Sequence, residues 1–272
     1  MDIVGASLMP LVSRHVYTAR VSQRVFVGVV ALVFAICAGA TVVWCLSMST
    51  IPELPMTGGW SLSMTWAPMC GQKWPRIAVS FVGMWIVMMA AMMLPSLAPV
   101  LWRYHEALGS TGRPRAYRLT VLAGMGYFAV WAVLGAIVFA LGFVFTMLAM
   151  QWPLLSRAVP LAGSLVVLLA GGLQFSGWKV RYLTCSQGVS LCREGSACMH
   201  GARLGIHCIV CCAGLTAVLL VNGMMDLRTM TLVTLAITAE RLAPAPERVA
   251  HAIGVVIVVI GLSMFARAIV LF

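Results

Sequence analysis

Seven stretches of this 272-residue chain are long apolar runs, and most of them are near the length that crosses a lipid bilayer. A transmembrane helix needs about 20 apolar residues, because the hydrocarbon core is about 30 Å thick. The runs cover approximately 25–46, 77–101, 119–149, 158–178, 204–221, 229–242 and 249–270. Only 9% of the residues are charged, against about 25% in an ordinary soluble domain. We therefore predict an all-α, polytopic transmembrane helix bundle forming a single membrane domain over residues 1–272.

The first and sixth runs decide how many spans are expected. The first, from Val25 to Leu46, exceeds the roughly 7–15 residues of a signal-peptide core and continues past the cleavage-like Ala38-Gly39-Ala40. We expect it to be an uncleaved signal anchor. The sixth run is shorter than the minimum of about 17 residues, so a tilted or partly re-entrant helix is expected there. The prediction is about seven spans, six full and one short.

The net charge of +11 bears on orientation. In a soluble chain this charge would suggest nucleic acid, but in membrane proteins Lys and Arg accumulate in cytoplasmic loops. With the N-terminus in the cytoplasm, thirteen of the 18 Lys and Arg residues fall in cytoplasmic segments. We therefore predict a cytoplasmic N-terminus, the lipid bilayer as a partner, and no nucleic-acid partner.

Six of the nine cysteines are concentrated in one short region of the chain. They are Cys185, Cys192, Cys198, Cys208, Cys211 and Cys212. The region comprises a predicted cytoplasmic loop and the start of the fifth span, a reducing location that disfavours structural disulfides. Metal binding or redox chemistry remains as the functional interpretation.

The densest part of this region is the segment His207-Cys208-Ile209-Val210-Cys211-Cys212. At about 100° per residue, its imidazole and three thiols occupy an arc of about 140° on one helix face. Small, soft cysteines also pack between membrane helices with no ligand role, and this remains the alternative. For three cysteines beside a histidine we favour metal ligation, because their softness and spacing agree.

The second span carries a matching stripe of methionines. Met84, Met88 and Met92 recur every fourth residue, and Pro95 is expected to kink the helix. A methionine stripe alone more often reflects packing than ligation. The depth of the stripe changes this interpretation, because Met88 to Met93 fall at about the depth of the cysteines on the fifth span. We expect the two patches to face each other.

Thiolates and thioethers with one imidazole are the ligands that Cu(I) prefers. Mg²⁺ and Ca²⁺ would require carboxylates, and zinc has less use for methionine. We therefore predict copper, as Cu(I), in a site between the second and fifth spans. The residue pattern supplies the candidate ligands His207, Cys208, Cys211, Cys212, Met88, Met89 and Met92.

Three further residues are candidates for supporting such a site. Glu240 lies at the inner end of the short span, where an ionisable group is costly and often functional; a Glu240-Arg241 pair reaching the headgroups is the alternative. Met225 and Asp226 lie in a short outer turn, where a solvated acid paired with Arg228 is the simpler interpretation.

On these residues the sequence resembles the bacterial family of predicted metal-binding integral membrane proteins, often labelled copper chaperones. The resemblance covers residues 75–262 approximately. It is carried by Trp85 to Pro95, Tyr104, Gly126-Tyr127, Trp131, Gln174, Lys179, Cys185, Gly201, Gly205, His207 to Cys212, Met225 to Leu227, Met230 and Glu240-Arg241. His207 before the first helix cysteine and Arg241 in place of a frequent Lys depart from the family pattern.

The resemblance implies a multi-pass protein of the bacterial inner membrane that binds copper. It also implies delivery of copper to a cuproenzyme such as a tyrosinase-like oxidase, and it adds Cys185 to the candidate ligands. The loop from Cys185 to Cys198 is looser than the family pattern, so Cys192 and Cys198 stay open as ligands.

Three functions therefore remain, of which a non-enzymatic Cu(I)-handling protein is our leading interpretation. A membrane thiol-disulfide oxidoreductase using Cys208-x-x-Cys211 is the second, although cytosolic thiols are already kept reduced. A structural subunit of a membrane complex, with no metal, is the third.

Overall fold

The computed structural model describes residues 4–49, 54–55, 61–62, 74–108, 113–177, 179 and 196–271. Within these residues the chain is almost entirely helical, which confirms the predicted all-α class. The helices are α1 (Val4–Ser49), α2 (Trp74–Ala107), α3 (Arg113–Gln151), α4 (Pro153–Gln174), α6 (Ala197–Asn222), α7 (Leu227–Leu242) and α8 (Pro246–Leu271). A ribbon of two-residue strands, β1 (Leu54–Pro55) and β2 (Ser61–Leu62), lies between α1 and α2, with Leu54 opposite Leu62.

Six of these helices are long and apolar enough to cross a membrane, and α7 is not. This agrees with six full spans and one short one. Several helices extend beyond their apolar runs: α1 begins at Val4 and α3 at Arg113. Hydropathy detects only the part of a helix that suits lipid, whereas the backbone hydrogen bonds of a helix continue into its polar ends.

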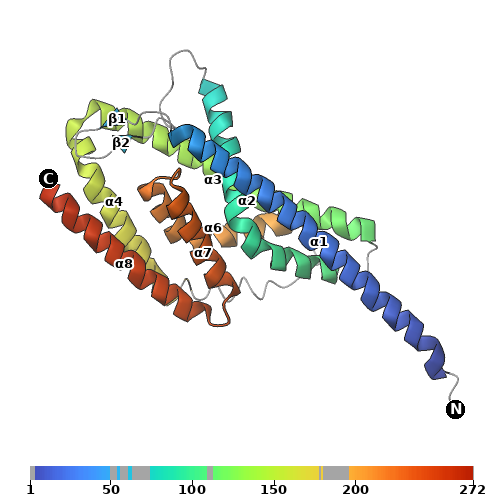
Figure 1. Cartoon of the computed structure of the whole chain (residues 1–272). Coiled ribbons are helices and arrows are strands. Elements are labelled where there is room, and N and C mark those ends of the chain that lie inside the picture. Colours follow the sequence, from blue (N-terminus) through green and yellow to red (C-terminus); the bar gives the residue numbers. More distant parts are fainter. Residues whose placement is uncertain are drawn as a thin grey trace.

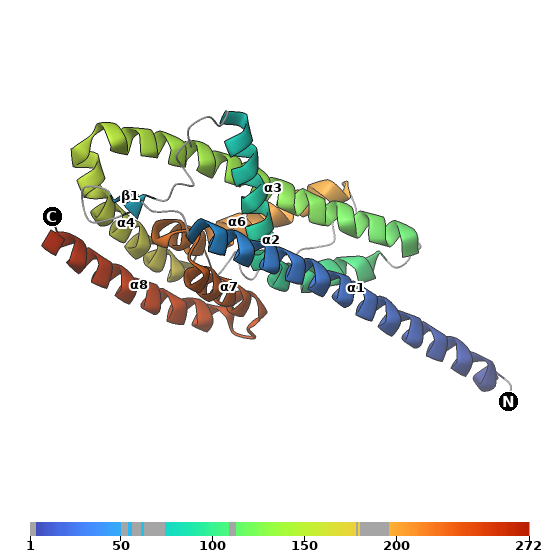
Figure 2. The ribbon, with the colours of Figure 1, turned by 45° about the horizontal axis from the view of Figure 1, so that its top comes forward.

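The helices are arranged around α2 and α6 (Figure 1). Helix α3 packs along both of them, and α7 contacts α2 and α6. Helix α1 lies against α2, and its N-terminal end projects away from the other helices in both views (Figure 2). Helices α4 and α8 pair along the opposite side of the molecule.

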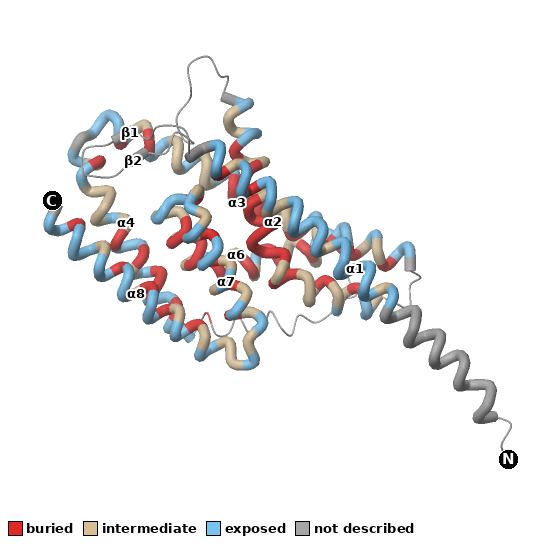
Figure 3. The backbone as a smooth tube through the Cα atoms, in the orientation of Figure 1, coloured by how far each residue is buried: buried red, intermediate tan, exposed pale blue. Residues whose placement is uncertain are grey.

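Burial follows the same arrangement (Figure 3). Buried residues concentrate on α2 and α6, whereas α1 and α8 present many exposed apolar side chains. Lipid tails are as apolar as these side chains, so a lipid-facing helix surface needs no polar cover. The buried side chains include Met93, Cys208, Cys212, Tyr127 and Glu240.

Glycines allow α3 and α6 to approach closely. A Cβ atom at Gly201 would collide with the backbone of Ala123, and one at Gly126 would collide with the backbone of Cys198. Gly205, one turn after Gly201, faces the backbone of Tyr127. Small residues four apart permit such close crossings in membranes. This crossing fixes the register of α3 against the cysteine-bearing part of α6.

A tight turn connects α6 to α7. Gly223 has φ 99°, a left-handed conformation that glycine adopts without a steric penalty. Asp226 then caps α7: its carboxylate accepts hydrogen bonds from the backbone N–H groups of Arg228 and Thr229 and from the Thr229 hydroxyl. These bonds, led by the hydroxyl, hold the pKa of Asp226 below its usual range.

Candidate metal centre

Three sulfur atoms from two helices meet inside the bundle. The Cys208 Sγ lies 3.8 Å from the Met93 Sδ and 4.0 Å from the Cys212 Sγ. All three side chains are almost completely buried, at 0% exposure for Cys208 and Met93 and 1% for Cys212. Met93 comes from α2, and Cys208 and Cys212 lie one turn apart on α6. We call these three residues the sulfur cluster.

Two sulfur–sulfur separations in the sulfur cluster can be compared with those of metal sites. With metal–sulfur bonds of about 2.3 Å, the length of zinc–thiolate bonds, a trigonal site has sulfurs about 4.0 Å apart and a linear site has them about 4.6 Å apart. The two observed separations, 3.8 Å and 4.0 Å, match the trigonal spacing. The distances from the Cys208 sulfur to its two sulfur neighbours therefore suit a soft metal ion.

Hydrogen bonds and ring packing hold the neighbouring residues in place. Tyr127 on α3 is buried and donates its hydroxyl hydrogen to the Cys208 Sγ, with 2.9 Å between the heavy atoms. On the neighbouring turns, Trp85 donates from Nε1 to the Trp131 carbonyl at 3.0 Å and packs over Gly135. These contacts attach α2 to α3 beside the sulfur cluster.

The prolines of α2 lie directly after Met93. Pro95 has no N–H to give to the carbonyl of Ala91, so an ordinary helical hydrogen bond is missing there. The Ser96 hydroxyl donates to the Met93 carbonyl at 3.0 Å. The helix continues through Pro95 and Pro99, and it changes direction along its length (Figures 1 and 2). Met93 therefore lies in a locally altered part of α2.

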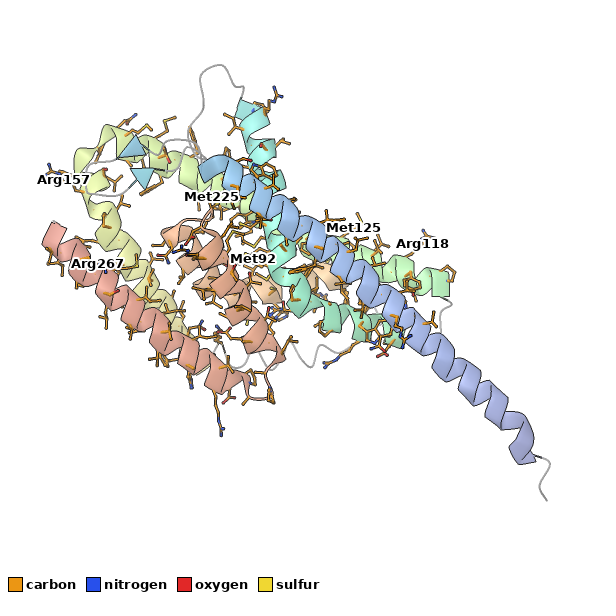
Figure 4. The ribbon with its side chains drawn as sticks, viewed as in Figure 1. Met92, Arg118, Met125, Arg157, Met225 and Arg267 are labelled. Atoms are coloured by element: carbon orange, nitrogen blue, oxygen red, sulfur yellow. The ribbon has the colours of Figure 1, made fainter. Side chains whose placement is uncertain are left out.

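The other methionines predicted on α2 are buried in the same core. Met88, Met89 and Met92 are at most 2% exposed and belong to the cluster of buried residues that includes Cys208 and Cys212. Figure 4 shows Met92 within the bundle, with Arg118, Arg157 and Arg267 at its periphery. Met93, which contacts Cys208, was absent from the predicted ligands although it adjoins Met92 in the same run.

The two other candidate ligands of the His207 to Cys212 segment lie in different surroundings. Cys211 is buried beside Cys212 on the same turn of α6. His207 is half-buried and lines a cavity of about 180 Å³ next to the sulfur cluster. Tyr127 and Arg241 line the same cavity. The structure thus gathers the predicted thiols at one place and places His207 in the adjacent wall.

Glu240 is paired within the protein. Its carboxylate forms an ion pair with Lys179 at 2.8 Å, and it is only 1% exposed. Lys179 also donates a hydrogen bond to the buried side chain of Gln174. The pair joins the end of α4 to α7, because Gln174 ends one helix and Glu240 belongs to the other. The alternative of a Glu240-Arg241 pair at the headgroups is therefore wrong.

Arg241 instead brings positive charge to the thiols. Its guanidinium interacts electrostatically with Cys208, Cys212 and Tyr127. Its Nε is buried and has no hydrogen-bond partner among the residues that the structure describes. Since Lys179 neutralises Glu240, the charge of Arg241 remains available to a negatively charged sulfur site.

Other predicted residues lie elsewhere or are not described. From Cys208 to the end of α6 is about 21 Å at 1.5 Å per residue, and Met225 and Asp226 lie beyond that end. The structure does not bring these two residues to the thiols, because Asp226 caps α7 at the far end of the helix. Cys198 is exposed on the first turn of α6. Cys185 and Cys192 lie outside the described residues.

In the described part of the chain, no group of three or more His, Cys, Asp and Glu side chains is arranged to hold a metal ion. Two thiols with a thioether as the third donor therefore form the best-supported site. Thioethers bind soft ions such as Cu(I) and contribute little to binding hard ions. The arrangement suits reversible binding of a soft cation in a site shielded from water.

Comparison with known proteins agrees with this chemistry. The sequence profile of the PpoB2 copper chaperone family matches residues 82–264, a region running from α2 into α8 and including the whole sulfur cluster. No curated protein and no solved structure matches the chain. Because the profile covers more than half of the sequence, the chain belongs to the PpoB2 copper chaperone family.

Proposed function

We propose that this membrane protein holds copper as Cu(I) through Cys208, Cys212 and Met93 and passes it to a client cuproenzyme. The observation that carries the proposal is the convergence of the three sulfurs at separations of 3.8 Å and 4.0 Å. Family membership supports copper handling in general. The sulfur cluster supports the oxidation state, because two thiols and a thioether select a soft monovalent ion.

Charge balance also favours Cu(I) over zinc. Two thiolates and one Cu(I) carry a net charge of about −1, which the neighbouring Arg241 guanidinium neutralises. A divalent ion on the same thiolates would form a neutral complex and would leave the Arg241 guanidinium, whose Nε is buried, without a compensating charge. Unpaired buried charge is costly, more so within a membrane.

The proposed role is not enzymatic. Its setting is the bacterial inner membrane, with the N-terminus in the cytoplasm and the six long helices crossing the bilayer. A client such as a tyrosinase-like oxidase would receive the copper. Buried sulfur ligands suit this task, since they shield Cu(I) from water and release it by exchange with other sulfur ligands.

The experiment is metal analysis of the purified protein after loading with Cu(I) as its acetonitrile complex. We expect about one copper per chain in the wild type and a loss of copper in Cys208→Ser and Cys212→Ser. Cys45→Ser is the matched control, because Cys45 is buried in α1. Wild-type stoichiometry in Cys208→Ser, or a copper-free wild type, would overturn the proposal. Thiol trapping that finds a Cys208–Cys211 disulfide in cells would favour the oxidoreductase instead.

A further inference from the structure

The cavity beside the sulfur cluster is lined by both exposed and buried residues. It has a volume of about 180 Å³, whereas a single water needs about 10–15 Å³. Among its lining residues, Arg103 and Leu242 are exposed, and Leu97 and Tyr127 are buried. The cavity is lined by Ser96, Leu97, Pro99, Val100, Arg103, Tyr127, Leu204, His207, Arg241 and Leu242. It can therefore admit a small organic molecule from the surface.

The wall of this cavity is positively charged. Arg103 on α2 and Arg241 on α7 both line it, and no acidic residue is among its described lining residues. Glu240, the neighbour of Arg241, is engaged by Lys179. The Arg241 Nε is buried without a hydrogen-bond partner in the described part of the chain. A bare Cu(I) cation would be repelled by these guanidinium groups, whereas an anion would be attracted.

The cavity reaches the sulfur cluster through Tyr127, and none of Met93, Cys208 and Cys212 lines it. Tyr127 lines the cavity, and its hydroxyl donates to the Cys208 Sγ at 2.9 Å. Arg241 lines the cavity and interacts electrostatically with Cys208 and Cys212. A ligand held by the cavity would therefore be separated from the Cys208 thiol by the side chain of Tyr127. The exposed lining residue Arg103 is on the side predicted to face the cytoplasm, where small thiols are kept reduced.

We propose that this cavity docks an anionic complex of Cu(I) with two small thiolates, from which copper passes to Cys208 and then to Cys212. The proposal rests on the Cu(I) function proposed above. Such a complex carries a charge of −1, and its thiolates match the ligands that receive the metal. The two guanidiniums hold it by charge and by hydrogen bonding.

The transfer is a ligand exchange with no change of oxidation state. The Cys208 Sγ forms a bond to copper while the bond from copper to one carrier thiolate breaks. The proton of the Cys208 thiol goes to the departing thiolate, which leaves as a neutral thiol. Cys212 then replaces the second carrier thiolate in the same way. The net charge of the copper complex stays at −1 throughout, opposite Arg241.

The test compares the rates at which detergent-solubilised protein takes Cu(I) from three carriers. Thioglycolate adds negative charge to the copper complex, 2-mercaptoethanol leaves it at −1, and cysteamine makes it positive. We expect uptake from the thioglycolate complex to exceed uptake from the cysteamine complex by about tenfold or more at low salt. Arg103→Gln should reduce this ratio severalfold. Arg118→Gln, which removes the same charge from an exposed position on α3, should leave it unchanged.

Each outcome has a definite meaning. Equal wild-type rates from the three carriers would overturn the docking proposal while leaving the copper site intact. An equal reduction of the ratio in Arg103→Gln and Arg118→Gln would also overturn it, because general surface charge would then explain the steering. A protein that takes no copper from any carrier, nor from the acetonitrile complex, would reject the sulfur cluster itself as a copper site and the docking proposal with it.

Discussion

Tyr127 on α3 donates its hydroxyl hydrogen to the Cys208 sulfur on α6, with 2.9 Å between Oη and Sγ and both side chains buried. The two residues are 81 positions apart in the sequence. A hydrogen bond to sulfur stabilises the thiolate form that binds a metal, so this contact makes Cys208 a better ligand. The glycines of the α3–α6 crossing make the contact possible by letting the two backbones approach.

Replacing the tyrosine with phenylalanine keeps the ring and removes only the hydroxyl. We expect Tyr127→Phe to weaken Cu(I) binding about ten- to a hundredfold, because a hydrogen bond to a charged group contributes about 1.5–3 kcal/mol. Competition with a chromophoric Cu(I) chelator measures the change. Tyr104→Phe is the control, since Tyr104 is half-buried and stacks on His200. An unchanged affinity in Tyr127→Phe would show that the hydrogen bond has no role in binding.

The close crossing of α3 and α6 predicts a strong effect of one added methyl group. Gly201→Ala should separate the helices, because its Cβ would meet the backbone of Ala123 rather than a mobile side chain. We expect a loss of about 1–3 kcal/mol in the free energy of unfolding and a reduced copper content. Gly83→Ala on α2 is the control, since nothing lies within 4 Å of a Cβ there. Equal thermal stability of the two variants in detergent would contradict the crossing.

The buried Lys179–Glu240 pair predicts a non-additive effect on stability. Glu240→Gln leaves Lys179 buried without its counter-charge, which costs about 3–5 kcal/mol. The double variant Lys179→Met with Glu240→Leu removes both charges and should be less harmful than Glu240→Gln alone. Unfolding in detergent measures both, with Glu106→Gln at an exposed position as the control. A double variant as unstable as Glu240→Gln, or less stable, would argue against a coupled pair.

The sequence was sufficient to predict the helical class, the short span and the meeting of the second and fifth spans. Apolar run length reports bilayer thickness directly, and the depths of Met88 to Met93 and of the cysteines follow from counting residues along each run. The short helix α7 was recognisable for the same reason, since its run ends at Glu240-Arg241.

Counting residues along the apolar runs could not identify Met93 as the methionine that contacts Cys208. The hydrophobic pattern of a helix identifies its buried face only when the opposite face has a different composition. Helix α2 is enclosed by α1, α3 and α7. Its methionines are therefore buried on several sides, and Pro95 alters the helix beside Met93. The partners of Cys208 and Glu240 come from distant segments, which no local pattern specifies.

Copper binding should depend on pH, because thiols bind copper as thiolates. Two thiols that are protonated in the free protein would each release a proton on binding. The affinity should then fall about tenfold per pH unit for each proton as the pH is lowered. Chelator competition between pH 6 and pH 8, corrected for protonation of the chelator, measures the slope. A flat profile would mean that the cysteines do not bind copper as newly formed thiolates.

The coordination of bound copper tests the central claim most directly. X-ray absorption at the copper edge, on wild-type protein loaded with one equivalent of Cu(I), counts the ligands and measures their distances. The sulfur cluster predicts three sulfur neighbours at about 2.3 Å and a count of two in Met93→Leu. Met224→Leu, which alters a methionine buried at the other end of α6, should keep three. A wild-type shell dominated by nitrogen or oxygen, or one unchanged by Met93→Leu, would contradict copper binding by Cys208, Cys212 and Met93.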